Sequence, residues 1–246
     1  ELPARSETVL EVEMSSAEVA LYEALRLKAI EKIAEAASED QSRGQQHLQV
    51  LAELTRLRLA CCHPTLVGGD GIESAKLALF REKVGEIVEG QHKVLVFSQF
   101  VKHLTILRDE LDSMGVSYQY LDGSTSMKRR KEAVQSFQSG KGDVFLISRR
   151  AGGTGLNLTA ADTVIHYDPW WNPAAENQAT DRAHRIGQDK PVFVYKLIAE
   201  DTIEDRILAL QQNKQALADS IYQEAGSSSG MLTAEDLREL FRPIDS

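Results

Sequence analysis

The chain has 246 residues, of which 42% are hydrophobic and 26% charged, and its formal net charge is −9. This apolar content is enough for a folded core and argues against global disorder. The negative charge argues against attraction of nucleic acid to the whole surface, but it leaves room for a local basic track. The sequence contains no apolar run of membrane-spanning length and no signal pattern. We therefore expect a soluble, intracellular protein with no membrane association.

The two cysteines, Cys61 and Cys62, are adjacent in the chain. Neighbouring cysteines rarely form a structural disulfide, and there is no second pair that could complete a zinc site. We expect both to face the core and expect no metal site in this chain.

The first part of the chain has a mostly helical pattern up to about residue 72. Ser15 and Glu18 form a capping-box-like start, and apolar residues continue the stripe until a polar gap at 38–46. A second helix is predicted from about Gln46, and it should stop before Pro64, where proline and nearby glycines follow.

The middle of the chain alternates strands with helices. Strands are expected at 93–98, 117–121, 143–148, 163–167 and 192–198, and two of the intervening helices at 127–137 and 174–184. Continuous apolar strands separated by helices predict an α/β fold with a parallel sheet covered on both faces. Ligands of such sheets bind at the carboxyl ends of the strands. Three loops follow strands at that edge, namely 98–99, 122–126 and 148–157.

The last part begins with a helix start at Thr202, and this helix is predicted to continue to about Glu224. A flexible Gly/Ser linker follows at 226–230, and Thr233 is expected to cap a short terminal helix. The sequence contains no internal repeat.

The segment 178–188, Gln-Ala-Thr-Asp-Arg-Ala-His-Arg-Ile-Gly-Gln, is the most informative stretch. Arg182 and Arg185 lie three residues apart inside the predicted helix and would share one face. Two guanidinium groups on one face suit a phosphate chain. The alternative is a pair of ordinary surface arginines, with Arg185 in an ion pair with Asp181.

The chain lacks the other parts of a nucleotide hydrolase of the P-loop kind. Its one Gly-Lys pair, Gly140-Lys141, is followed by Gly142 rather than a hydroxyl residue, and no apolar strand ends in an Asp-Glu pair that could hold Mg²⁺. The arginines therefore have no phosphate cradle in this chain. Arginine fingers commonly work in this way, supplied from a separate domain or subunit.

Two loops at the expected carboxyl edge are candidates for phosphate binding. The first, 148–158, is glycine-rich and contains Arg149 and Arg150, although a tight turn alone would also explain its glycines. In the second, 121–126, Ser124, Thr125 and the start of the next helix could bind a backbone phosphate. Ser126 could instead simply cap that helix.

Other residues near these loops could extend a nucleic-acid track. A basic block, 128–131, follows the second loop, and the only two tryptophans, Trp170 and Trp171, follow a later strand. Core packing is the default for one tryptophan, whereas an aromatic at a strand end could touch a nucleic-acid sugar or base.

Taken in order, these segments resemble the second RecA-like lobe of superfamily-2 helicases, and more narrowly the SWI/SNF-type DNA translocase family. The segments 94–100, 120–126 and 146–162 resemble motifs IV, IVa and V, and 168–188 resembles motifs Va and VI. The resemblance covers roughly residues 1–225. In one departure, Arg149 stands where the family often has a threonine.

The resemblance implies a RecA-like lobe at 74–200, a linker strand and helical protrusion at 1–73, and a brace helix, linker and terminal helix at 201–246. Arg182 and Arg185 would act as arginine fingers on ATP, which an absent first lobe of the same protein would hold with Mg²⁺. Other ATP-binding positions would be Gly153, Gly155, Gln178 and Asp181. Double-stranded DNA would be bound by Ser98, Gln99, Ser124, Thr125, Lys128, Arg149, Arg150 and Trp171.

The implied function is the second motor lobe of an ATP-dependent double-stranded DNA translocase, inactive as an isolated chain. Its location would be the cytoplasm or nucleoid of a prokaryote, or the nucleus of a eukaryote. Two alternatives stay open: an RNA helicase lobe, and a catalytically inert module that binds nucleic acid or protein. The protein or other substrate that would be moved on DNA cannot be named from the sequence.

Overall fold

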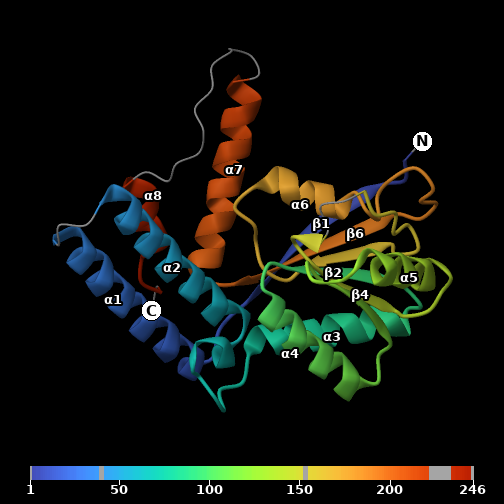
Figure 1. Cartoon of the computed structure of the whole chain (residues 1–246), viewed down its shortest axis with the longest axis horizontal. Helices are drawn as coiled ribbons and strands as arrows, with labels where there is room; N and C mark the ends of the chain where they lie inside the picture. Colours follow the sequence, from blue (N-terminus) through green and yellow to red (C-terminus); the bar gives the residue numbers. More distant parts are fainter. Residues whose placement is uncertain (1, 39–41, 152–154, 222–233, 245–246) are drawn as a thin grey trace. The chain divides into compact units, whose positions relative to one another are not determined.

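The computed structural model of the protein describes residues 2–38, 42–151, 155–221 and 234–244 (Figure 1). The chain divides into two compact units. The first comprises residues 1–12 and 76–198, and the second comprises residues 13–75 and 199–246. The domain boundaries that the sequence predicts near residues 73 and 200 stay predictions.

The first unit is built on a six-stranded sheet with the strand order β1-β6-β5-β2-β4-β3. Its strands are β1 (Arg5–Val12), β2 (Val94–Ser98), β3 (Tyr118–Leu121), β4 (Val144–Ser148), β5 (Thr163–His166) and β6 (Val192–Ala199). The pairings of β2 with β4 and β5, of β3 with β4, and of β5 with β6 are parallel. The parallel α/β sheet predicted from the sequence is therefore confirmed, with an additional edge strand, β1.

Helices cover the sheet on both faces. The helices of this unit are α3 (Ala75–Glu89), α4 (Val101–Met114), α5 (Met127–Gln138) and α6 (Pro173–Thr180). Phe137 of α5 and Ala179 of α6 pack with Leu95 and Phe97 of β2 in one core cluster. Figure 1 shows α3 and α4 below the sheet and α6 above it. Residues of β2 and β4 are buried on both faces, which is why these strands are continuously apolar in the sequence.

The register aligns the carboxyl ends of the central strands. Ser98 of β2 lies opposite Ser148 of β4, and Leu121 of β3 lies opposite Ile147. Phe97 likewise lies opposite His166, the last residue of β5. The three loops expected at this edge therefore begin at one level of the sheet.

The second unit contains α1 (Ser16–Ser38), α2 (Arg43–Cys62), a 3₁₀ turn at Pro64–Val67, α7 (Ile203–Ile221) and α8 (Ala234–Leu240). The predicted capping box is present, since the Ser15 hydroxyl accepts from the Glu18 amide and the Glu18 carboxylate accepts from the Ser15 amide. The second helix begins at Arg43, three residues earlier than expected, because Ser42 and Gln45 form a second capping box. Cys61 and Cys62 are both buried, as predicted, and they are not joined in a disulfide.

One predicted helix is shorter in the structure than expected. The sequence pattern favoured a helix over 174–184, but α6 ends at Thr180 and residues 181–187 form turns. None of the helices in the described part of the chain combines the length and apolar character needed to span a bilayer.

Candidate functional site: a cleft and an arginine hollow on the sheet-bearing unit

A cleft of about 920 Å³ lies where β2, β3 and β4 end. It forms because the aligned strand ends bring their loops together at one edge of the sheet. Its lining residues are Gln99, Phe100, Val101, Asp122, Gly123, Ser124, Ser148, Arg149 and Arg150. Four of the residues predicted to bind DNA, Gln99, Ser124, Arg149 and Arg150, therefore share one cavity.

The loop after β2 is fixed by a buried carboxylate, that of Asp168. The Ser98 hydroxyl donates to one Asp168 oxygen across 2.7 Å, and the Gln99 amide lies 3.3 Å from both oxygens. Ser98 is completely buried. Its side chain thus holds the loop in place, while Gln99 faces the cleft.

The loop after β3 is organised by Asp122. Its carboxylate accepts from the Ser124 amide at 2.8 Å and from the Ser124 hydroxyl at 2.6 Å. Partial burial raises the pKa of Asp122, but hydrogen bonds from Ser124 and Tyr120 outweigh it and leave this pKa below its ordinary value. The Thr125 hydroxyl accepts from the Asp122 amide and does not line the cleft. Ser126 caps α5, as the alternative interpretation of this loop proposed.

The two arginines after β4 have different surroundings. Arg150 is exposed, whereas the guanidinium of Arg149 lies over the ring of Trp170, 5.3 Å from its centroid. Trp170 is the core tryptophan, only 2% exposed, and Trp171 is half-buried outside the residues that line the cleft. Lys128 is exposed on the first turn of α5 and also lies outside the lining.

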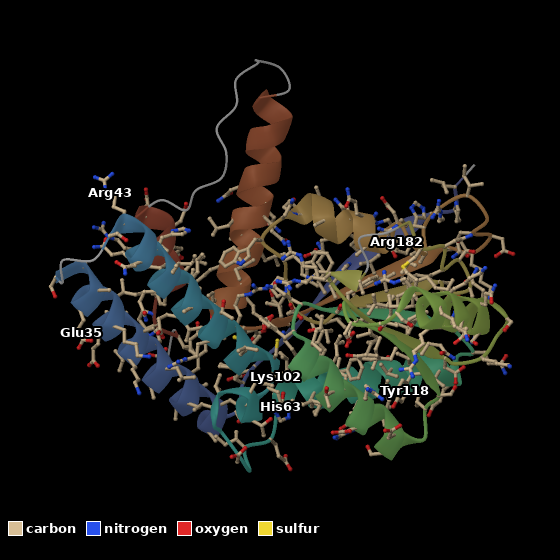
Figure 2. The ribbon with its side chains drawn as sticks, in the orientation of Figure 1. Glu35, Arg43, His63, Lys102, Tyr118 and Arg182 are labelled. Carbon is tan, nitrogen blue, oxygen red and sulfur yellow. The ribbon has the colours of Figure 1, made fainter. Side chains whose placement is uncertain are left out.

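A second hollow, of about 710 Å³, surrounds the two arginines of the 178–188 segment. It is lined by Leu2, Gly155, Asn157, Gln178, Asp181, Arg182, His184, Arg185 and Ile186. Figure 2 shows Arg182 just beyond the end of α6. The structure thus brings together Arg182, Arg185 and three of the four residues predicted to surround ATP; the fourth, Gly153, lies outside the described residues.

The arginines lie in a turn and not, as predicted, on one helical face. We call residues 181–187 the arginine turn. The regular helical ladder ends here because the Arg182 and Ala183 amides donate to carbonyls three residues back, those of Ala179 (3.2 Å) and Thr180 (3.0 Å), rather than four. Gly187, with φ of 101°, then adopts a left-handed conformation that favours glycine and reverses the chain.

The alternative ion pair between Asp181 and Arg185 is also absent from the structure. Asp181 lies 3.4 Å from Arg5 of β1, and Arg185 donates to the Leu156 carbonyl at 3.3 Å. The Asp181 carboxylate thus forms its ion pair with Arg5 of β1, and not with Arg185 as helix periodicity had suggested.

Arg182 is half-buried, and its Nε atom has no hydrogen-bond partner among the described residues. Burial lowers the pKa of Arg182, and the neighbouring charge of Arg185 lowers it further, while Asp181 opposes the shift. A guanidinium that is desolvated beside a second cation is stabilised when an anion binds. The charge and desolvation of these arginines therefore favour an anion in the hollow.

Sequence reasoning missed the residues that hold this turn in place. The side-chain nitrogen of Gln188 lies 3.2, 2.8 and 3.0 Å from the carbonyl oxygens of Thr159, Ala161 and Ala183. His184 contacts the Pro3 carbonyl at 2.8 Å. No periodicity marks these contacts, because they join segments far apart in the sequence.

The donor set of the described residues offers no metal centre, since no group of three or more His, Cys, Asp or Glu side chains converges among them. Each hollow contains one aspartate, and its other polar lining groups are arginines and neutral polar side chains. Such groups recognise phosphate.

Residues 76–187 match the family model described as the helicase conserved C-terminal domain. Two relatives are similar to nearly the whole chain. An uncharacterized ATP-dependent helicase of Mycoplasma pneumoniae is 39% identical over 242 residues, which are 98% of this chain and 23% of the relative. The human SWI/SNF-related matrix-associated actin-dependent regulator of chromatin subfamily A member 1 is 34% identical over 261 residues, 98% of this chain and 24% of that protein. The chain thus spans about a quarter of the length of these relatives.

Solved structures agree with this assignment. The Sulfolobus solfataricus SWI2/SNF2 ATPase C-terminal domain superimposes with a TM-score of 0.77 at 28% identity, covering 97% of this chain and 99% of that domain. The ATPase core of the same organism, solved in complex with dsDNA, gives a TM-score of 0.78 at 30% identity, covering 97% of this chain and 50% of that chain. The protein therefore belongs to the SWI/SNF-type family of superfamily-2 helicase-like proteins, as a C-terminal RecA-like lobe.

Proposed function

We propose that this chain is the second motor lobe of an ATP-dependent double-stranded DNA translocase. The observation that carries the proposal is the arginine hollow. It places Arg182 and Arg185 together, with the Nε of Arg182 buried and available, in a chain that has no phosphate-binding lysine motif of its own. Such a hollow is incomplete until a second body presents a phosphate chain to it.

In this mechanism the first lobe lies outside this chain and holds ATP and Mg²⁺. Arg182 and Arg185 would donate to the terminal phosphate and stabilise the charge that develops there, and a finger of this kind contributes roughly 10³–10⁵ to the rate in well-studied systems. Gly155, Gln178 and Asp181 would shape the rim of the hollow. Asp181 would also limit the excess of positive charge when no phosphate is present.

The cleft would hold the sugar-phosphate backbone of one DNA strand. The cleft offers one exposed cation, Arg150. It also offers polar groups of Gln99 and Ser124 at the edge of the sheet where the strands end. These groups match phosphates rather than base edges, so binding would be independent of base sequence and would weaken as salt rises. A related ATPase core was solved in complex with dsDNA, which supports duplex DNA as the partner.

Opening and closing of the space between the two lobes would shift one grip on DNA relative to the other. This chain would contribute one grip and the arginines, and the first lobe would contribute the other grip and the nucleotide cradle. The motor would work wherever its DNA lies, in the nucleoid of a prokaryote or the nucleus of a eukaryote.

The test uses the complete two-lobe protein that contains this chain. Arg182→Ala and Arg185→Ala should each lower DNA-stimulated ATP turnover by roughly 10³-fold or more while leaving DNA affinity unchanged. Arg129→Ala, which removes an exposed arginine of α5 outside both hollows, serves as the control and should retain turnover. Equal loss of turnover and DNA binding would point to a folding role. Stronger stimulation by structured RNA than by duplex DNA would favour an RNA helicase.

A further inference from the structure

A continuous series of contacts runs through the core from the cleft to the arginine turn. The guanidinium of Arg149 lies 5.3 Å from the ring centroid of Trp170. The Trp170 ring meets His166 edge-on, with 5.7 Å between ring centroids and an interplanar angle of 82°. His166 Nε2 then lies 2.9 Å from the hydroxyl of Thr180. Trp170, His166 and Thr180 are each at most 2% exposed, so solvent cannot take the place of these contacts.

Thr180 is the residue from which the arginine turn is built. Its carbonyl accepts from the amides of Ala183 and His184, which both lie in the arginine turn. Arg182 follows only two residues later, and its own carbonyl accepts from the Leu158 amide at 3.0 Å. A shift of Thr180 therefore moves the backbone that carries Arg182.

The hydrogen bond between His166 and Thr180 has a defined direction. The Thr180 hydroxyl donates to the Glu176 carbonyl at 3.3 Å, so its oxygen is free to accept from His166 Nε2. Burial lowers the pKa of His166 to about 4, which keeps the ring neutral with a single N–H. His166 Nδ1 has no hydrogen-bond partner among the described residues, as expected for the nitrogen without the proton. His166 is thus the donor and Thr180 the acceptor.

The contact at the cleft end of the series can be replaced by a ligand. A phosphate group binds a guanidinium through charge-assisted hydrogen bonds, which are stronger than the attraction of a cation to an aromatic face. DNA in the cleft would therefore draw Arg149 away from Trp170. The Trp170 ring, released on that side, could then change its packing against His166.

We propose that His166 and Thr180 are positioning residues that transmit occupancy of the DNA cleft to Arg182, an inference that rests on the proposed function. Neither residue touches DNA or nucleotide. Their hydrogen bond determines whether a change at Trp170 reaches the backbone of the arginine turn.

The test is a nuclear magnetic resonance titration of the ¹⁵N-labelled chain with a short duplex DNA. The chain has only two tryptophans, so the indole N–H signal of Trp170 is readily assigned, and the Nε–H signal of Arg182 reports on the turn. In the wild type, both signals should shift along one binding curve. In Thr180→Val, which replaces the hydroxyl with a methyl group of similar size, the Trp170 signal should still shift while the Arg182 shift is lost.

Matched variants separate the hydrogen bond from general packing. Thr180→Ser keeps the hydroxyl and should restore the Arg182 shift, and His166→Gln, which keeps a donor near the Nε2 position, should do the same. His166→Leu removes the donor from the other side and should behave like Thr180→Val. Thr163→Val, a buried threonine of β5 outside the series, should respond like the wild type.

The outcomes distinguish the two proposals. If DNA moves the Trp170 signal but Arg182 shifts equally in the wild type, Thr180→Val and His166→Leu, then transmission through His166 and Thr180 is wrong. The same conclusion follows if the wild type shows a Trp170 shift without any Arg182 shift. If duplex DNA moves neither signal in the wild type and does not bind, the proposed DNA grip itself fails. Signal dispersion in each spectrum reports whether the variant is folded.

Discussion

The side-chain amide of Gln188 lies 2.8 Å from the carbonyl oxygen of Ala161, which lies two residues before the start of β5. The same nitrogen lies 3.0 Å from the carbonyl of Ala183, in the arginine turn. One buried amide therefore ties the turn to the sheet. Because the turn lacks the regular bonding of a helix, such a tie determines where the arginines of the hollow are held.

We predict that Gln188→Leu lowers the free energy of unfolding by roughly 1–3 kcal/mol, because buried carbonyl groups would lose their donor. Urea denaturation of the purified chain measures this change. Gln178→Leu is the matched control, since Gln178 is exposed on α6, and its effect should stay within about 0.5 kcal/mol. Equal stability of the two variants would show that the Gln188 contacts contribute nothing to the folded state.

A second prediction concerns the buried Asp168 beneath the cleft. Asp168→Asn keeps the shape of the side chain but removes the negative charge that accepts from the Ser98 hydroxyl and the Gln99 amide, and it replaces one of the two oxygens with a donor. Loss of these charge-assisted bonds should lower the free energy of unfolding by about 1–3 kcal/mol. Hydrogen exchange of the Gln99 amide should become faster. Asp189→Asn, on the exposed surface, is the control, and unchanged exchange at Gln99 in Asp168→Asn would contradict this role.

Most of the fold could be predicted from the sequence because local patterns determine it. Continuous apolar runs such as 94–98 and 144–148 give strands buried on both faces, and the alternation with helices gives a parallel sheet. The rule that loops meet at the carboxyl edge then brings Gln99, Ser124 and Arg150 into one cleft. The contacts of these residues with DNA stay predictions.

The parts that sequence reasoning missed depend on contacts between distant segments. The stretch after Thr180 retains helix-favouring residues, so periodicity extended α6 to residue 184. Gln188, His184 and Arg5 override that preference through bonds to distant carbonyl and carboxylate groups. Burial of Ser98 was likewise hidden, since its partner Asp168 lies 70 residues away along the chain.

A third prediction concerns the exposed cation of the cleft. Arg150→Ala should weaken binding of duplex DNA to a similar extent for every sequence, because a phosphate contact carries no base information. The slope of log affinity against log salt should become less steep by about 0.9, the value for one lost phosphate contact. Fluorescence anisotropy at several salt concentrations measures both quantities.

The control for Arg150 is Lys141→Ala. Lys141 is exposed and precedes β4, so it lies at the opposite edge of the sheet from the cleft. The Lys141→Ala substitution removes the same charge as Arg150→Ala, but it should leave the slope of log affinity against log salt unchanged. Identical losses for the two variants would mean that net charge, rather than the cleft, determines affinity.

A fourth prediction follows from the buried ring of His166. Burial lowers the pKa of His166 from its ordinary 6.5 to about 4, against the opposing charge of Glu176. Between these values the unfolded chain binds a proton that the folded chain does not, so this residue makes the protein less stable as the pH falls. The loss should be roughly 2 kcal/mol between pH 7 and pH 5. His166→Gln removes the titrating group, so the difference in unfolding free energy between wild type and variant should shrink or reverse over that interval.

Urea denaturation at pH 7, 6 and 5 measures this difference. His47→Gln, at an exposed position of α2, is the control and should keep the wild-type dependence of stability on pH. If His166→Gln loses stability on acidification as steeply as the wild type, the ring is accessible to protons in the folded state, and the fixed direction of its bond to Thr180 no longer holds.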